Sequence, residues 1–246
     1  MRHLGTNKQQ KHCTLSTYII ADTHGCLKTL QKLLENEIGI TPQDSLYFLG
    51  DYIDRGRNSA QLVDYLINLR SNGYSVTCLM GNHEQMLLDA IQDDNVYNDW
   101  MLHFGFKTID SYTELIGQQF SFPKDIPQSH IDFYQNLPFF IELDQCVLVH
   151  GGFNFGAENP LLDTRSMLWM RTEMIPDSFM PNKVVMYGHT PTSIETIKKS
   201  IKARSSRQIP LDAGCVYYGM GFSLGYLVAL ELENWKLHIV KNSEIL

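Results

Sequence analysis

The sequence predicts an α/β fold whose core is a parallel β-sheet. Three short apolar runs rich in β-branched residues are typical of buried strands, and each ends in a polar loop. After each loop, apolar residues recur at the spacing of an amphipathic helix. The loops begin at Asp22, Asp51 and Asn82, so the unit repeats about every 30 residues, which is the length of a βαβ unit.

These three units are expected to share one edge of the sheet. The strands are predicted over residues 17–21, 45–49 and 75–80. The helices are predicted from the apolar residues Leu27, Leu30, Leu33, Leu34, Leu62, Val63, Leu66, Leu69, Met86, Leu87 and Ala90. Parallel strands joined by right-handed crossovers bring their carboxyl ends to one edge, where ligands bind in open α/β sheets. Asp22, Asp51 and Asn82 are therefore predicted to be neighbours.

Residues 97–136 interrupt this pattern. Aromatic residues are spread among polar ones, with Pro123 and Pro127 as breakers, which predicts short helices and loops that cover one end of the sheet. The aromatic side chains either pack in the core or line a substrate groove. Packing is the favoured interpretation, because aromatic residues dominate protein cores.

The second half of the chain supplies further strands. Residues 139–143 and 146–149 predict a hairpin, and residues 184–187 predict a single strand. The closing strands are predicted over residues 211–214, 226–232 and 235–240, the last two as a hairpin. The basic residues of segment 198–207 are predicted to form a solvated hairpin tip, with substrate steering as the less favoured alternative.

The composition is that of a globular protein. The chain has 246 residues, of which 43% are hydrophobic and 19% charged, enough for one large domain. The net charge of −7 argues against partners such as nucleic acid or an anionic membrane, because both need a basic face. Residues 1–16 are polar and predict a flexible arm without a signal peptide. Five scattered cysteines without CxxC spacing indicate free thiols and a cytoplasmic location.

Polar residues that can bind a metal or a phosphate follow the predicted strands and lie beside glycines. They are Asp22, His24, Asp51, Asp54, Arg55, Asn82, His83, His150 and His189. Carboxylates, imidazoles and an amide oxygen, without cysteine, suit Mn²⁺, Fe or Zn²⁺. A tetrahedral ion takes about four ligands, fewer than this set offers, so two ions that share one carboxylate are predicted. Pairs of ions about 3.5–4 Å apart serve to cleave phosphate esters.

These motifs resemble those of the metallo-dependent phosphoprotein phosphatases (the PPP family), especially bacterial and phage serine/threonine protein phosphatases. The family is marked by GDxHG, GDxxDRG, GNHE, a His-Gly element and GHT. The matching segments here are residues 21–25 (ADTHG), 50–56 (GDYIDRG), 81–84 (GNHE), 150–152 (HGG) and 188–190 (GHT), with 168–171 (LWMR) and 211–214 (LDAG) in addition. The resemblance spans about residues 17–232.

The resemblance implies a calcineurin-like metallophosphoesterase fold, in which two mixed β-sheets pack as a sandwich flanked by helices. Residues 17–246 would form a single catalytic domain. Two divalent metal ions are implied, with Mn²⁺ favoured over Fe or Zn²⁺. The implied ligands are Asp22 and His24 for the first ion, Asp51 as the bridge between both, and Asn82, His150 and His189 for the second ion.

The resemblance assigns the remaining site residues to the substrate. Arg55 and Arg171 would hold the phosphate, because one guanidinium can bind two phosphate oxygens. His83 would protonate the leaving alkoxide, and Asp54 would orient His83. The implied reaction is hydrolysis of phosphoserine and phosphothreonine in proteins, by direct attack of a hydroxide that bridges the metals. Phosphotyrosine and small phosphoesters stay open as substrates.

Two rival functions are weighed against this one. Symmetrical dinucleoside tetraphosphate hydrolases share the scaffold, but they usually lack the acidic residue that Asp54 provides before Arg55. Asp54 therefore favours the phosphomonoesterase. An inactive module that binds phosphorylated partners is disfavoured, because every expected ligand is present.

The chain also departs from the family pattern. Ala21 stands where the first motif has glycine, and Ala213 stands where a DTG element has threonine. The segment around Tyr217 and Tyr218 differs from the family, so the resemblance implies no role for these residues. The native substrate and the oligomeric state stay open at this stage.

Overall fold

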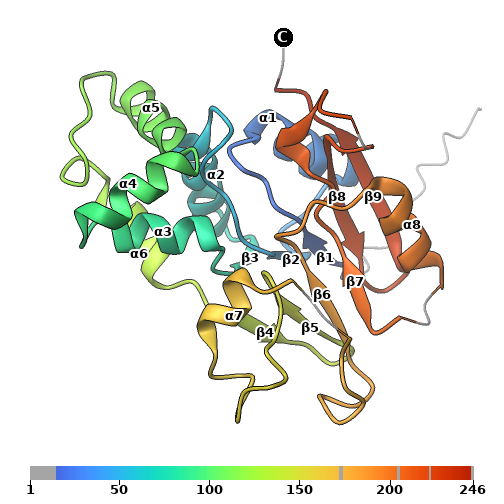
Figure 1. Cartoon of the computed structure of the whole chain (residues 1–246). Helices are drawn as coiled ribbons and strands as arrows, with labels where there is room; N and C mark the ends of the chain where they lie inside the picture. The colour runs from blue at the N-terminus through green and yellow to red at the C-terminus, as the bar shows by residue number, and fades with distance from the viewer. Residues whose placement is uncertain (1–14, 172–173, 204–205, 222, 245–246) are drawn as a thin grey trace, which may run out of the picture.

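The computed structural model describes residues 15–171, 174–203, 206–221 and 223–244, which form two β-sheets flanked by helices (Figure 1). The first sheet has the strand order β3-β2-β1-β8-β9 and the second the order β4-β5-β6-β7. The strands are β1 (Thr17–Ile20), β2 (Ser45–Phe48), β3 (Ser75–Cys78), β4 (Phe140–Glu142), β5 (Cys146–Val149), β6 (Val184–Tyr187), β7 (Gln208–Pro210), β8 (Tyr226–Glu231) and β9 (Lys236–Lys241). Both sheets mix parallel and antiparallel pairs, which confirms the predicted fold class.

Helices flank the two sheets (Figure 1). The α-helices are α1 (Leu27–Gln31), α2 (Ser59–Ser71), α3 (Asn82–Ala90), α4 (Asp94–Leu102), α5 (Gly105–Ile116), α6 (Gln128–Gln135), α7 (Thr164–Trp169) and α8 (Ile194–Ala203). A π-helical segment, η1 (Lys32–Ile38), continues α1, and a short 3₁₀ turn, η2 (Cys215–Tyr217), precedes β8.

The three strand–loop–helix units form the parallel half of the first sheet. β1 pairs with β2, and β2 with β3, both in parallel. The three predicted strands are confirmed, although each ends one or two residues earlier than predicted. The two predicted hairpins are confirmed as the antiparallel pairs β4–β5 and β8–β9. The sheet therefore collects the polar loops at one edge.

Strand β1 lies between two apolar layers. Ile19 faces the core between the sheets, together with Leu148 and Met186 of the second sheet. Tyr18 and Ile20 face the core beneath the helices, as the two-residue period of a strand requires. Ile19 and Ile20 are fully buried, and each such side chain contributes about 1.5–3 kcal/mol relative to an exposed one. The two sheets thus form a sandwich around a shared core.

Helices α4, α5 and α6 form a lobe on one side of the molecule, next to α2 and α3 (Figure 1). Trp100 and Tyr112 are buried in this lobe, so packing is the correct interpretation for these aromatic residues. Phe104 and Phe106 are instead exposed. The lobe begins with α4 at Asp94, slightly before the predicted boundary.

Two predictions for the second half are wrong. Segment 198–207 is not a hairpin tip, because its residues up to Ala203 belong to α8. Ile194, Ile197 and Ile201 recur at helical spacing and pack onto the core between the sheets, which favours a helix. Residues 211–214 form a loop after β7 instead of a strand. The Asp212 carboxylate accepts the N–H of the residue two positions later (2.7 Å), which stabilises a turn there.

The predicted arm over residues 1–16 lies outside the described residues, except for its last two. The division into an arm and a single domain therefore stays a prediction. Within the described part of the chain, no helix combines the length and the apolar character needed to cross a bilayer.

Candidate metal centre and active site

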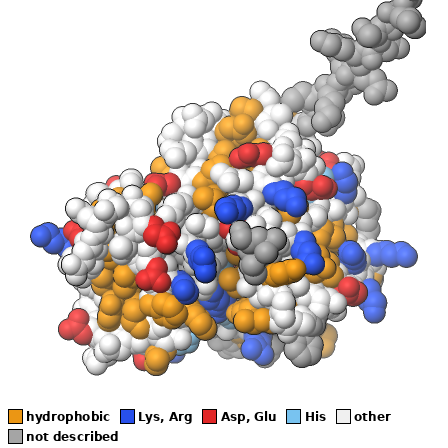
Figure 2. Space-filling view, turned by 90° about the horizontal axis from the view of Figure 1, so that it is seen from above, with side chains coloured by type: hydrophobic (Ala, Val, Ile, Leu, Met, Phe, Trp, Pro, Cys, Tyr) orange, Lys and Arg blue, Asp and Glu red, His pale blue; other side chains and the backbone are white. Residues whose placement is uncertain are grey.

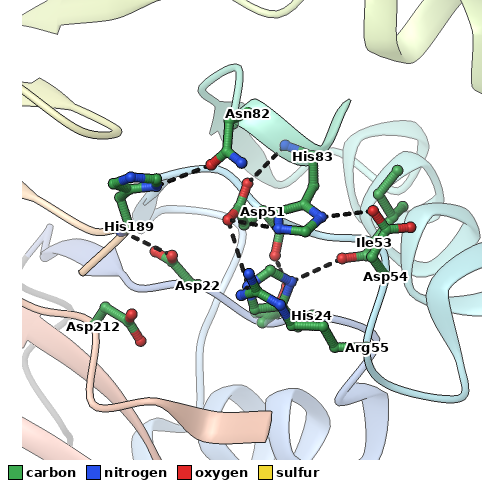
Figure 3. Close-up of polar contacts among 12 residues, drawn as sticks. Asp22, His24, Asp51, Ile53, Asp54, Arg55, Asn82, His83, His189 and Asp212 are labelled. Carbon is green, nitrogen blue, oxygen red and sulfur yellow. Dashed lines mark hydrogen bonds and ion pairs between the residues drawn. The ribbon is translucent and has the colours of Figure 1, made fainter. Parts of the chain in front are cut away.

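The loops after β1, β2 and β3 meet at one edge of the first sheet (Figure 3). The N–H groups of Thr23 and His24 donate to the carbonyl oxygen of Asp51, at 3.1 and 2.8 Å. Asp51 Oδ1 accepts the N–H of His83, in the first turn of α3, at 3.2 Å. The loop after β5 joins them, since His150 Nδ1 donates to the Leu49 carbonyl (2.9 Å). The predicted meeting of these loops is confirmed.

The backbone of the site is held in a conformation that side chains disfavour. Five predicted site residues have positive φ angles, between 40° and 66°: His24, Asp51, Asp54, Arg55 and His189. Residues other than glycine adopt this region at a cost of about 1–3 kcal/mol each, and such strain concentrates at functional sites. The surrounding hydrogen bonds stabilise these conformations.

Two groups of potential metal ligands share Asp51. Within each group, one ligand atom from every residue lies within 4.8 Å of the others. The groups are His24, Asp51 and His83, and Asp51, His150 and His189. A carboxylate common to both groups fits the predicted bridge between two ions. The first group differs from the prediction, because it contains His83 in place of Asp22.

Backbone carbonyls orient two of the imidazoles. Nδ1 of His24 lies 2.8 Å from the Ile53 carbonyl oxygen, and Nδ1 of His150 contacts a carbonyl in the same way. Nε2 of each ring is thereby turned towards Asp51, at 3.4 Å in both cases. A hydrogen bond from one ring nitrogen to a carbonyl oxygen, which leaves the other nitrogen for the metal, is typical of metal-binding histidines.

Asn82 links the remaining predicted ligands. Its Oδ1 atom lies 2.9 Å from His150 Nε2 and 2.9 Å from His189 Nδ1. The N–H of His189 donates to Asp22 Oδ2 (2.8 Å). All six predicted ligands, Asp22, His24, Asp51, Asn82, His150 and His189, therefore belong to one connected cluster, in which only His189 is more than slightly exposed.

The charges in the cluster depend strongly on one another. Burial raises the pKa of Asp51, but His150 and the other nearby imidazoles lower it further, to well below its usual value. Burial lowers the pKa of His150, but the Asp51 carboxylate raises it to about 10. Burial and the Arg55 guanidinium keep the pKa of His24 well below its usual value. His24 is thus neutral, which is the form that binds metals.

A second pair of acidic groups lies against the cluster. Burial and the neighbouring Asp212 raise the pKa of Asp22 well above its usual value, and burial raises the pKa of Asp212 to about 6. Among the described residues, Asp22 Oδ1 is buried without a hydrogen-bond partner. A divalent cation would satisfy this oxygen and relieve the repulsion, so the donor set fits the predicted metals.

His83 and Asp54 form a close pair beside the cluster. His83 Nδ1 donates to Asp54 Oδ2 over 2.6 Å, and both side chains are fully buried. Nε2 of His83 lies 4.0 Å from Asp51 Oδ2 and has no hydrogen-bond partner among the described residues. The imidazole is thereby held at one nitrogen and open towards the metal-binding cluster at the other.

The two predicted phosphate-binding residues differ in their positions. Arg55 Nη1 donates to His24 Nε2 (2.6 Å), and the Arg55 guanidinium lies 5.6 Å from the centre of the Tyr217 ring. Arg171 is exposed, and no described contact joins it to the other site residues. Trp169 nevertheless brings this segment close, because its ring meets the His189 ring edge-on at 6.3 Å.

Sequence reasoning missed the role of Glu84 in the GNHE motif. Its buried carboxylate accepts the N–H groups of Asp51 (3.0 Å), Tyr52 (2.8 Å), Ile53 (3.2 Å) and Gly81 (3.1 Å). These bonds shape the loop that carries Asp51. The motif itself was the available signal, since a glutamate three residues into a helix is a typical capping residue.

The helical lobe also reaches the site, which the sequence did not indicate. Trp100 Nε1 donates to Asp54 Oδ2 (2.8 Å), and Thr108 Oγ1 donates to Asp54 Oδ1 (2.5 Å). Trp100 is one of the aromatic residues in segment 97–136, for which packing was the favoured interpretation, and nothing in the sequence pointed to Thr108.

Comparison with known proteins gives the family. The calcineurin-like phosphoesterase model matches residues 15–221. A symmetrical bis(5′-nucleosyl)-tetraphosphatase of Pseudomonas putida is 39% identical over 79 residues, which are 32% of this chain and 26% of that relative. A symmetrical bis(5′-nucleosyl)-tetraphosphatase of Actinobacillus succinogenes is 43% identical to this chain over 74 residues, which are 30% of this chain and 26% of that relative. The matched segments thus span about a quarter of these curated relatives.

Solved structures extend the likeness to nearly the whole chain. A cold-active protein-tyrosine phosphatase of a psychrophilic Shewanella species has a TM-score of 0.60 at 18% identity, and the match covers 94% of this chain and 79% of that one. A protein serine/threonine phosphatase from Saccharomyces cerevisiae has a TM-score of 0.57 at 14% identity, and the match covers 94% of this chain and 81% of that one. At such identities the likeness concerns the fold. Because the family model matches most of its length, the chain belongs to the calcineurin-like phosphoesterases and is a metallophosphoesterase.

Proposed function

We propose that the chain is a two-metal phosphomonoesterase that removes phosphate from phosphoserine and phosphothreonine in proteins. The supporting observation is the buried pair in which His83 Nδ1 donates to Asp54 Oδ2 over 2.6 Å. The alkoxide released from serine or threonine is a strong base and needs a proton as the ester bond breaks. A histidine held at Nδ1 by a carboxylate can deliver that proton from Nε2.

The metal ligands in this proposal are the six residues Asp22, His24, Asp51, Asn82, His150 and His189. When bound to these residues, two divalent ions, with Mn²⁺ proposed, would supply a water molecule of lowered pKa and positive charge for the phosphate oxygens. Arg55, and Arg171 from the segment after Trp169, would hold the phosphate so that its leaving oxygen faces His83.

Positive charge at the site supports a phosphorylated substrate, because the Arg55 guanidinium lies 2.6 Å from His24 Nε2. The net charge is −7, and Figure 2 shows Lys and Arg side chains interspersed with Asp and Glu on one face of the molecule. A cytoplasmic location is part of the proposal, and it is supported by Cys26, Cys78, Cys146 and Cys215, which are buried free thiols.

A symmetrical dinucleoside tetraphosphatase is the second candidate, and identity to the Pseudomonas putida relative favours it. Its leaving group would be a nucleoside diphosphate, which departs as a stable anion and therefore depends less on protonation. Proton donation by His83, which Asp54 holds in place, would accelerate the departure of an alkoxide more than that of a nucleoside diphosphate. This difference in leaving groups favours the phosphomonoesterase. An inactive binding module is the weakest candidate, because the full set of ligands and His83 is retained.

The deciding experiment compares substrates on the protein loaded with Mn²⁺. Phosphoserine, phosphothreonine and phosphotyrosine peptides, p-nitrophenyl phosphate and diadenosine tetraphosphate are assayed side by side, with and without metal. We expect kcat/KM for the phosphoserine peptide to exceed that for diadenosine tetraphosphate by at least about tenfold. The opposite order would establish the tetraphosphatase, and no turnover of any substrate by metal-loaded protein would establish the binding module.

A further inference from the structure

Both oxygens of the Asp54 carboxylate accept hydrogen bonds from the helical lobe. Oδ2 receives Trp100 Nε1 (2.8 Å) in addition to His83 Nδ1 (2.6 Å), and Oδ1 receives Thr108 Oγ1 (2.5 Å). All four side chains are fully buried. Three donors on one carboxylate fix its position.

Thr108 holds the backbone of Asp54 as well. Its hydroxyl oxygen accepts the Asp54 N–H (2.9 Å). Ser59 Oγ is a second acceptor of the same N–H group (3.1 Å). Asp54 has a φ of 66°, a conformation that an aspartate adopts only with support. One hydroxyl therefore stabilises both the unusual backbone and the side chain of the residue that holds His83.

Trp100 is itself fixed in place. Its ring packs against Tyr97 (6.2 Å between centres) and Phe122 (5.3 Å). A methyl group at Gly105 would approach Trp100 Cδ2 to 2.5 Å, so the close contact between α4 and α5 requires glycine there. The indole N–H thus reaches Asp54 from a rigid part of the lobe.

We propose that Trp100 and Thr108 are positioning residues, which hold the Asp54 carboxylate so that His83 presents Nε2 to the leaving oxygen. A carboxylate rotates easily about its Cβ–Cγ bond, because that torsion has a broad preference. Donors on both oxygens prevent this rotation and keep Oδ2 on the Nδ1–H of His83. The inference rests on the proposed role of His83 as proton donor.

The variants Trp100→Phe and Thr108→Val separate positioning from packing. Thr108→Val keeps the shape of the side chain, Trp100→Phe keeps an aromatic ring, and each removes the donor to Asp54. Tyr112→Phe is the matched control, because Tyr112 is buried in the same lobe and its hydroxyl bonds with His130 (2.9 Å) and Tyr134 (3.0 Å), not with Asp54. If Trp100→Phe does not fold, Thr108→Val provides the same test.

The kinetic test compares two leaving groups on metal-loaded protein. We expect kcat for a phosphoserine peptide to fall roughly 10- to 100-fold in both variants, part of the 10²–10⁴-fold that a general acid contributes. The leaving group of p-nitrophenyl phosphate depends little on protonation. Its kcat should therefore change by no more than about threefold, with KM unchanged. Tyr112→Phe should affect both substrates alike. Equal losses on both substrates in Trp100→Phe and Thr108→Val would overturn the proposal.

A second test is independent of turnover. In the metal-free protein, the short bond between His83 and Asp54 should give a low-field proton resonance, which is assigned by its loss in His83→Asn. Trp100→Phe and Thr108→Val should shift this resonance, and Tyr112→Phe should leave it in place. An unchanged resonance in both variants would refute the positioning role. A shifted resonance in a protein that hydrolyses no phosphomonoester would refute the proposed function and leave the positioning intact.

Discussion

Gly188 provides a test of the metal centre that alters no predicted ligand. A methyl group at this position would lie 3.1 Å from Asp22 Cγ and closer still to Asp22 Oδ1. Cβ atoms essentially never come within 3.0 Å of other heavy atoms, so the carboxylate would have to move by on the order of 1 Å. Asp22 is buried, and its Oδ2 accepts the N–H of His189, so such a movement would also disturb His189, a proposed ligand of the second ion.

The magnitude follows from what a displaced ligand costs. Loss of a supporting contact around a metal typically weakens binding 10- to 100-fold, and a displaced ligand weakens it at least as much. We therefore expect Gly188→Ala to bind one Mn²⁺ ion roughly 100-fold more weakly than the unmodified protein does. Turnover should fall at limiting metal and recover in part at excess metal.

The assay is equilibrium dialysis against increasing Mn²⁺, with bound metal counted per chain. Gly156→Ala is the matched control, because Gly156 is exposed and its nearest neighbour, Asn154 Oδ1, would lie 3.3 Å from the new methyl group. Circular dichroism checks that both variants are folded. A folded Gly188→Ala protein that binds two Mn²⁺ ions with unchanged affinity would refute the assignment of Asp22 as a ligand.

Two further predictions concern buried groups near the site. Burial raises the folded-state pKa of Asp212 to about 6, above its ordinary value of 3.8, so its contribution to stability is complete below about pH 4 and is lost as the pH rises to 6. The free energy of unfolding of Asp212→Asn, relative to that of the unmodified metal-free protein, should therefore rise by about 3 kcal/mol between these pH values. Urea unfolding in the presence of chelator measures this difference, and a difference that does not change with pH would contradict the prediction. The contact with Cys26, together with burial, raises the pKa of Cys215 well above its usual value, so this thiol is no nucleophile. Cys215→Ser should keep kcat within about twofold, and a loss of roughly 100-fold with normal metal content would require a covalent intermediate instead.

Regular patterns made much of the fold predictable. The strand β1 alternates between two cores, and the loops after β1, β2 and β3 follow one another at the βαβ interval, so local sequence was sufficient to place them at one edge. Helix α8 was missed because its positive charges suggested a surface turn. The spacing of Ile194, Ile197 and Ile201, which packs the helix onto the sheets, was the stronger signal.

The sequence by itself determined the chemical inventory of the site. Glycine-bounded motifs supplied Asp51, Asn82, His150 and His189, which the structure gathers in one cluster. Only the tertiary structure decided what surrounds that inventory. Trp100 and Thr108 reach Asp54 across 46 and 54 residues of sequence, and a hydrogen bond over such a separation leaves no periodic pattern in the chain. The protonation of each buried group likewise depends on charges brought close by folding, which no local sequence pattern contains.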